Sequence, residues 1–380
     1  MTEIEFVTKH RRHLHENPEL SMNESETTSY IIEIIESLGI DYTQPLPTGV
    51  VAYLKGNSNT TLGFRADIDA LPIHEENDVD YKSKNEGVMH ACGHDGHTAA
   101  LLLFLKRCKR LKDDGALPHN CHFIFQPSEE TMAGAKQLID NWTDSQAIDA
   151  IFGIHIMPDE KTGLALFRDN EITASATEYR FYVNGLSAHV ANKHNGKSAV
   201  ESLMFITREI TQIQQFHLDG LNRNIIHIGQ MNAGEAINTV PSNGYLEGTI
   251  RTYEENDLSI IKNHMEKIKT GAMNLYDCEI ELTYNEGYPP VKNTPALQNV
   301  VYDSVQSAGM KAVIKDKPYL FGEDFSFYDE IAPTYFIFVG AQDEEQGFTS
   351  SLHTSTFNFD ESVLVKVADY YENILKNYSN

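Results

Sequence analysis

Three short apolar runs, each leading into acidic or histidine side chains, constrain the fold of this chain more than any other feature. They lie at residues 61–69, 121–126 and 150–155, and helical segments precede the second and the third run. Buried strands that alternate with helices indicate a largely parallel sheet, which binds ligands beyond the carboxyl ends of its strands. Five polar side chains fall at those ends: Asp67, Asp69, Glu129, Glu130 and His155.

The order of the predicted elements changes between residues 178 and 286. Here a strand, a helix, two strands, a helix and a strand follow one another, which is the split βαβ pattern of a ferredoxin-like unit. A chain of 380 residues is also too long for one ordinary core. We therefore predict an α/β catalytic domain formed by residues 1–177 and 287–380, which an inserted α+β domain at residues 178–286 interrupts.

The net charge of the chain limits the classes of partner that it can bind. It contains 30 Lys and Arg against 55 Asp and Glu, a formal net charge of −25, and such a surface repels phosphate backbones and anionic membranes. The N-terminus lacks the pattern of a signal peptide, the four cysteines show no disulfide-like spacing, and the longest apolar run is too short to span a membrane. We predict a cytoplasmic protein that acts on a small molecule and binds neither nucleic acid nor membrane.

Two neighbouring segments carry the side chains of a hydrolytic metal centre. Cys92 and His94 stand one residue apart in a histidine-rich segment that leads into an apolar helix, which we expect to begin near Thr98. Glu129 and Glu130 follow the second apolar run. A divalent cation held by thiolate, imidazole and carboxylate activates water, and another carboxylate must take the proton. We predict that Glu130 binds the metal and that Glu129 is the general base, although the spacing also permits the reverse.

Two histidines and two aspartates extend this set. His155 ends an apolar strand and His353 lies in a polar loop, so either alone fits a structural role, but both together can complete a pair of metal sites. Asp67 and Asp69 alternate across a strand end. One of them can be a ligand with the other behind it, or they can have a structural role, either orienting a ligand histidine or capping the next turn.

Two residues of the inserted segment are candidates for contacts with substrate. If this domain pairs with another subunit, His189 can act as an electrophile in the neighbouring active site. Arg251 ends a strand and can clamp a substrate carboxylate. A surface position without a catalytic role is the alternative for each.

Seven motifs lie in order along nearly the whole chain. They read RRHLHENPE from Arg11, FRADIDALP from Phe64, MHACGHDGHT from Met89, FQPSEE from Phe125, GIH from Gly153, GTIR from Gly248 and GEDFS from Gly322. Together they resemble the amidohydrolase branch of the aminoacylase and glutamate-carboxypeptidase metallopeptidase family. The resemblance implies a zinc-peptidase-like α/β domain, an inserted dimerisation domain, and hydrolysis of amide bonds with one or two divalent metal ions.

The resemblance also implies roles for single residues, carried over by motif. Glu129 corresponds to the general base and His189 to the inserted-domain histidine that stabilises the oxyanion. The segments around His189 and after His155 depart from the usual family pattern, which leaves the choice of substrate open. Asn238, Arg251 and Gly322 fall at the predicted substrate-binding positions. The implied metal ligands are Cys92, His94, Glu130, His155 and His353.

These observations predict a metal-dependent amidohydrolase that removes the acyl group from an N-acyl amino acid and forms a homodimer or a higher homo-oligomer. The donor set fits zinc or manganese first, and it also admits cobalt or nickel. An aminopeptidase or dipeptidase is the alternative within the enzymes. A non-catalytic oligomeric binding module is the alternative outside them, and the complete ligand set beside Glu129 argues against it.

Overall fold

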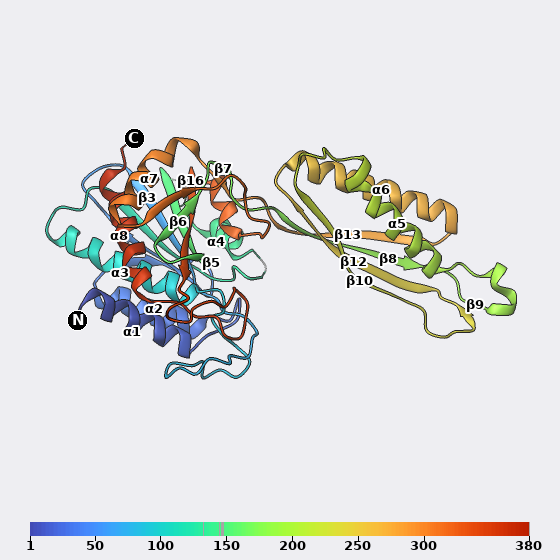
Figure 1. Ribbon diagram of the computed structural model, residues 1–380, viewed down its shortest axis with the longest axis horizontal. Coiled ribbons are helices and arrows are strands. Elements are labelled where there is room, and N and C mark those ends of the chain that lie inside the picture. The colour runs from blue at the N-terminus through green and yellow to red at the C-terminus, as the bar shows by residue number, and fades with distance from the viewer. Residues whose placement is uncertain (132, 144, 146–147, 380) are drawn as a thin grey trace. The chain divides into compact units, whose positions relative to one another are not determined.

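The computed structural model describes residues 1–131, 133–143, 145 and 148–379. The chain forms two compact units (Figure 1). The first unit consists of Met1–Ile172, Val291–Pro318 and Asp324–Asn380, and the second of Thr173–Pro290 and Tyr319–Glu323. None of the helices in these described ranges is long and apolar enough to cross a membrane.

An eight-stranded sheet forms the centre of the first unit. Its strands β4, β3, β5 and β16 run parallel, while β1, β2 and β4 pair antiparallel, as do β16 and β6. Every residue of β3 and β4 is buried, as expected for strands covered on both faces. The predicted, largely parallel α/β sheet is therefore confirmed. In sheet order the strands are β1 (Asp41–Thr43), β2 (Val50–Leu54), β4 (Asn120–Gln126), β3 (Thr61–Asp67), β5 (Ala150–Lys161), β16 (Thr334–Gln342), β6 (Leu164–Phe167) and β15 (Lys311–Ile314).

Helices cover this sheet. Helix α3 packs on β3 and β5 and is flanked by α1 and α8 (Figure 1). Its residues from His94 to Leu105 are all buried, which explains why the apolar run there has no polar face. The helices of this unit are α1 (Glu3–Glu16), α2 (Ser25–Ser37), α3 (His94–Asp113), α4 (Gly134–Asn141), α7 (Gln298–Ser307) and α8 (Ser362–Asn377), with short elements η3 (Pro295–Leu297), η4 (Asp324–Glu330), β7 (Asn170–Glu171) and β14 (Lys292–Asn293).

Three elements differ from the predicted ones and move candidate residues. Helix α3 begins at His94 rather than near Thr98, because Gly93 adopts a left-handed φ of 88° that turns the chain into the helix. Strand β4 ends at Gln126, so the two adjacent glutamates lie in the loop beyond it rather than at the strand end. Strand β5 continues beyond His155 to Lys161, because β16 pairs with it over this length.

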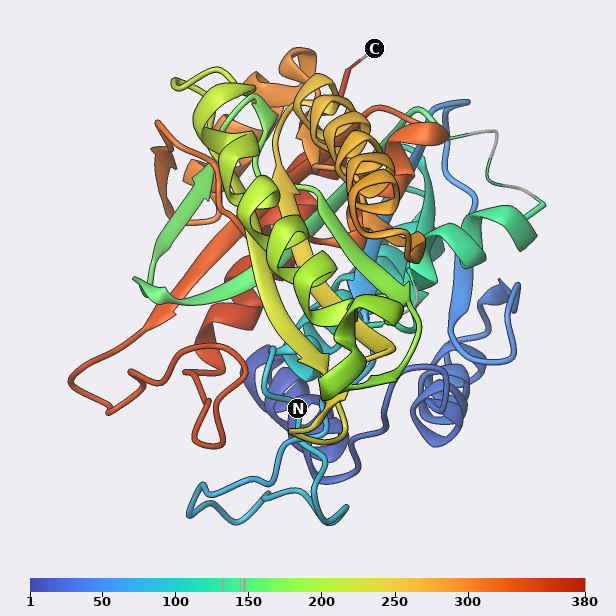
Figure 2. The ribbon, with the colours of Figure 1, turned by 90° about the vertical axis from the view of Figure 1, so that its right-hand side faces the viewer.

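The second unit has an antiparallel sheet with its own core. Helices α5 and α6 lie side by side on one face of this sheet (Figure 2). Along β8 buried and more exposed residues alternate, and the buried ones join apolar residues of both helices. The observed order of strands and helices matches the predicted split βαβ pattern. In sheet order the strands are β10 (Asn224–Ala233), β12 (Asn243–Thr252), β8 (Ala176–Asn184) and β13 (Glu279–Tyr288), and the helices are α5 (Ala199–Phe216) and α6 (Glu255–Tyr276).

This unit also contains a small sheet that the sequence does not predict. It joins β9 (Ala188–His189) to β11 (Thr239–Val240), and the helical segment η2 (Val190–Asn195) follows β9 directly. Strands of two residues are too short to show an alternating pattern in the sequence.

A fully buried arginine ties helix α1 to the start of α3. The guanidinium of Arg11 donates from Nε to Asp95 at 3.1 Å and from Nη2 to Asn358 at 2.8 Å. It also pairs with Glu361 at 3.3 Å and lies over the ring of Phe359, 4.3 Å from its centroid. Removing one partner of a buried ion pair leaves the other charge unpaired, which destabilises a protein strongly.

Replacing Arg11 by Met is therefore expected to lower the free energy of unfolding of the first unit by about 3–5 kcal/mol. Arg12 provides the matched control, because it pairs with the same Glu361 but its side chain is 44% exposed. Its replacement by Met should cost at most about 1 kcal/mol. Urea unfolding of chelator-treated protein measures the free energy of unfolding of both variants. The fluorescence of the single tryptophan, Trp142, reports on this unit, because Trp142 lies in it and is 4% exposed. Equal losses would contradict the role given to Arg11.

Candidate metal centre

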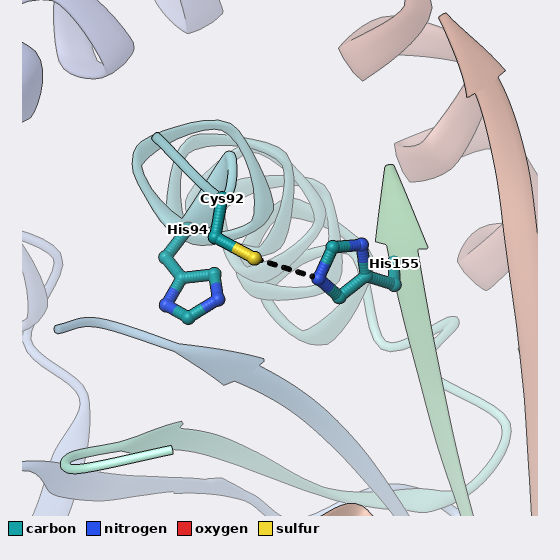
Figure 3. Close-up of side chains that lie close together, drawn as sticks. All are labelled: Cys92, His94 and His155. Atoms are coloured by element: carbon teal, nitrogen blue, oxygen red, sulfur yellow. Dashed lines mark hydrogen bonds between the residues drawn. The ribbon is translucent and has the colours of Figure 1, made fainter. Parts of the chain in front are cut away.

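One group of possible metal ligands lies at the junction of α3 and β5. The ligand atoms of Cys92, His94 and His155 lie within 4.8 Å of one another, and all three residues are buried. Cys92 lies just before Gly93, the residue that caps α3, His94 is the first residue of α3, and His155 belongs to β5. In Figure 3 the sulfur of Cys92 points toward the ring of His155, and Sγ and Nε2 are 3.3 Å apart.

A second group shares the same cysteine. The ligand atoms of Cys92, Glu130 and His353 also lie within 4.8 Å of one another. Nε2 of His353 is 3.3 Å from Cys92 Sγ and 3.3 Å from Glu130 Oε1. The loop that carries His353 is held by its backbone N–H, which donates to the carbonyl of Ala91 at 2.9 Å. Since the His353 side chain is 51% exposed, this second group lies closer to solvent than the first.

Hydrogen bonds fix the orientation of the two buried histidines. His94 donates from Nδ1 to the carbonyl of Asp69 at 2.9 Å, and His155 donates from Nδ1 to the carbonyl of Ile156 at 2.7 Å. When neutral, as a metal ligand must be, each ring presents an unprotonated Nε2 to the group. Within the described residues, the buried Nε2 of His94 makes no hydrogen bond, and the buried Oε1 of Glu130 has an ion-pair contact with His353 at 3.3 Å but no hydrogen bond. Unpartnered buried acceptors are costly, so this donor set fits a divalent cation.

The electrostatics of the site also favour positive charge. Burial alone would lower the pKa of His94, but the carboxylates of Asp67, Asp69 and Glu130 raise that pKa to about 10. Burial, and then Glu130 and other nearby carboxylates, raise the pKa of the Cys92 thiol well above its usual range. A thiolate therefore forms here when a cation accompanies it, so metal binding would release the proton of Cys92.

Asp69 connects two of the candidate ligands. Besides the bond from His94 to its carbonyl, its Oδ2 accepts the hydroxyl of Ser21 at 2.6 Å and the backbone N–H of Glu130 at 3.0 Å. Of the two roles that the sequence permits, these contacts favour the orienting one, because a single residue fixes His94 and the loop of Glu130 together.

The two adjacent glutamates take different places. Glu130 joins Cys92 and His353, whereas the carboxylate of Glu129 lies within the same 4.8 Å limit of His94 and Glu130. Over the described part of the chain, Glu129 shares no such group with Cys92. Glu129 is buried, so its carboxylate lies beside the candidate ligands and away from bulk solvent. This placement favours Glu130 as the ligand.

The second unit holds the remaining candidates. His189 is exposed at the end of β9, and its Nδ1 accepts the backbone N–H of Ala191 at 3.1 Å. Asn238 lies beside this strand, since its carbonyl accepts the N–H of Val190 at 3.0 Å. The structure thus brings His189 and Asn238 together.

The other two candidates of this unit lie in different elements. Arg251 is half-buried in β12, where its Nη1 donates to the Ile250 carbonyl at 3.2 Å. Gly322 packs tightly between β8 and β13, because a Cβ there would lie 3.1 Å from both Ala176 and Tyr288. The described contacts give neither residue a bond to His189 or Asn238.

The family model of peptidase family M20/M25/M40 matches residues 63–377. An uncharacterized hydrolase of Staphylococcus epidermidis is 59% identical over 380 residues, covering 100% of this chain and 99% of that protein, and one of Staphylococcus saprophyticus is 58% identical with the same coverage.

Two solved structures cover nearly the whole chain. A candidate aminohydrolase from methicillin-resistant Staphylococcus aureus has a TM-score of 0.93 at 28% identity and covers 100% of this chain and 97% of its own. The YxeP protein of Bacillus subtilis, described as a dinuclear metal-binding peptidase of the M20 family, has a TM-score of 0.84 at 29% identity and covers 98% and 97%. The protein belongs to peptidase family M20/M25/M40 and is a hydrolase of that family.

Proposed function

We propose that the protein is a metal-dependent amidohydrolase that cleaves N-acyl amino acids and holds two divalent ions. The observation that carries this proposal is the pair of ligand groups that share Cys92. One ion would lie between Cys92, His94 and His155, and the other between Cys92, Glu130 and His353. The likeness to a dinuclear metal-binding peptidase supports two ions, and zinc or manganese fits this mixed donor set, ahead of cobalt or nickel.

Bound divalent ions supply the acidity that activates water and polarises the scissile carbonyl. Glu129 takes the proton of the attacking water and returns it to the leaving amine, so one carboxylate serves as base and then as acid. The backbone N–H of the neighbouring Glu130 donates to Asp69, which fixes the loop there. In this proposal Glu130 binds the metal and Glu129 transfers the proton. Burial excludes bulk water that would otherwise exchange with the transferred proton.

His189 supplies the oxyanion donor in this proposal. Because Nδ1 accepts the Ala191 N–H, the neutral ring carries its proton on Nε2, which can donate to the substrate carbonyl oxygen. Asn238 and Arg251 bind the substrate carboxylate, and Gly322 shapes the same pocket.

We further propose that residues 178–286 form a dimerisation domain, through which His189 serves the active site of a second subunit. Large apolar side chains of this segment are exposed, among them Phe216, Leu221 and Ile237, and a contact between subunits would remove such side chains from water. A cytoplasmic location accords with four cysteines that carry free thiols.

Metal stoichiometry tests the two ligand groups. Wild-type protein should bind two ions per chain, since two groups are present. His155→Ala and His353→Ala should each lose one ion, and Cys92→Ser should impair both sites because Cys92 is shared. Dialysed protein measured by inductively coupled plasma mass spectrometry gives these ratios. The exposed His74 belongs to neither group, so His74→Ala is the control and should keep both ions. Retention of two ions by Cys92→Ser would refute the shared ligand.

The adjacent glutamates provide a matched pair of variants for the general base. Glu129→Gln should lower kcat by at least about 100-fold, the smaller end of what a general base contributes, and should keep its metal content. Glu130→Gln should instead lose metal, since Glu130 belongs to the second group. Steady-state kinetics and metal analysis of the same preparations separate the two. Normal turnover by Glu129→Gln would exclude it as the base.

A substrate panel tests the proposed activity. Metal-reconstituted protein should release primary amine from N-acetyl and N-aroyl amino acids, and much more slowly from the corresponding dipeptides with a free N-terminal amine. Chelator-treated protein serves as the blank. A preference for free-amine dipeptides would identify a peptidase instead. No release from any compound, with two ions bound, would contradict the proposed substrate class while leaving the metal centre in place.

A further inference from the structure

A buried histidine outside the two ligand groups lies one helical turn after His94. His97 is fully enclosed, and its Nε2 accepts the backbone N–H of Ile156 at 3.0 Å. A nitrogen that accepts carries no proton, so the neutral ring bears its proton on Nδ1. That nitrogen donates to Oδ1 of Asp67 at 2.6 Å. Both nitrogens of His97 are therefore occupied.

Because both nitrogens are occupied, His97 has no free lone pair to give to a third possible ligand group. The ligand atoms of Asp67, His94 and His97 lie within 4.8 Å of one another and could in principle hold a metal. However, Oδ1 of Asp67 accepts from His97, and Oδ2 accepts from Nη1 of Arg65 at 2.6 Å. Of the three, only His94 keeps an unpartnered nitrogen, and that nitrogen belongs to the first group.

The backbone of Ile156 connects His97 to the metal centre. Its N–H donates to His97, and its carbonyl accepts from Nδ1 of His155 at 2.7 Å. The backbone of Ile156 is therefore hydrogen-bonded to both histidines. Its bond to His155 fixes the orientation of the ring that faces Cys92 in Figure 3. The rings of His97 and His155 are close, with centroids 4.8 Å apart at 69°.

Arg65 fixes the carboxylate that fixes His97. Its Nε donates to Gln126 at 2.8 Å and its Nη2 to Asp324 at 2.8 Å, so the guanidinium is held on three sides by buried groups. Because Arg65 always donates, Asp67 must accept from it, and the other oxygen of Asp67 then accepts from Nδ1 of His97. The arrangement allows only the tautomer that accepts the Ile156 N–H.

We propose that His97 is a positioning residue of the metal centre: it fixes the Ile156 backbone, and through that backbone the ring of His155, while Asp67 and Arg65 hold it in the required tautomer. The proposal rests on the proposed binding of metal at Cys92, His94 and His155. It gives His97 no contact with substrate or metal, so substitutions of His97 change the geometry of the site without removing a ligand.

Two amides of different reach test this role. His97→Gln places an acceptor oxygen near the position of Nε2 and can still hold the Ile156 N–H, whereas His97→Asn reaches only the position of Nδ1. Neither changes the charge of the site. Apparent Co²⁺ affinity, measured by competition with a chromophoric chelator, should fall about 10–100-fold in His97→Asn and stay close to wild type in His97→Gln. The visible absorption bands of bound Co²⁺, which depend on ligand geometry, should change in His97→Asn alone.

Controls separate this proposal from general damage and from the proposed function. Leu102→Ala removes buried apolar contacts on the same helix and should leave the Co²⁺ bands unchanged. Equal affinity and spectra for the Gln and Asn variants would overturn the positioning role, whereas a wild-type protein that binds no metal would overturn the proposed function itself.

A measurement on the wild type needs no variant to fold. In protein labelled with ¹⁵N-histidine, His97 should give the NMR signature of a neutral ring protonated at Nδ1. A ring protonated at Nε2, or at both nitrogens, would overturn the proposal.

Discussion

Buried negative charge at the carboxyl edge of the eight-stranded sheet is the constraint on which the rest of the structure depends. Asp67 and Asp95 are almost fully enclosed, and an ionised carboxylate is costly there unless a cation accompanies it. The chain supplies two buried guanidiniums, Arg65 from β3 and Arg11 from α1. These cations pair with Asp95 and Asp67 and leave Glu130 to the second ligand group, where divalent ions would complete the balance. A chain with a net charge of −25 can therefore concentrate acidic side chains at one edge of a sheet.

The backbone of the sheet sets the direction of the ligand side chains. His94 and His155 each donate to a carbonyl, and those carbonyls belong to Asp69 just beyond β3 and to Ile156 within β5. Strand register therefore controls where the free nitrogens point. The group of Cys92, His94 and His155 is therefore supported by a strand and a helix, whereas His353 lies in a loop and its side chain is half exposed. The two proposed ions thus differ in how firmly the protein holds their ligands.

The sequence predicts the sheet and the ligand groups because apolar runs and Cys-x-His or Glu-Glu motifs are local patterns. It does not predict where α3 begins, since that depends on the left-handed backbone of Gly93. Nor does it reveal the hydrogen bonds of His97, because one of them comes from a backbone N–H that only the pairing of distant elements brings near. The sequence also leaves open which of Glu129 and Glu130 is the metal ligand, and the distance of 3.3 Å between His353 and Glu130 favours Glu130.

The position of β16 in the sheet affects the order in which parts of the protein fold during synthesis. This strand lies between β5 and β6 in the sheet, yet it leaves the ribosome after both of them and after the whole inserted unit. The inserted unit, with its own core, can fold during synthesis, while β5 waits with one edge unpaired. Cys92 and His155 are then present long before His353, so the second ligand group can be completed only after the first.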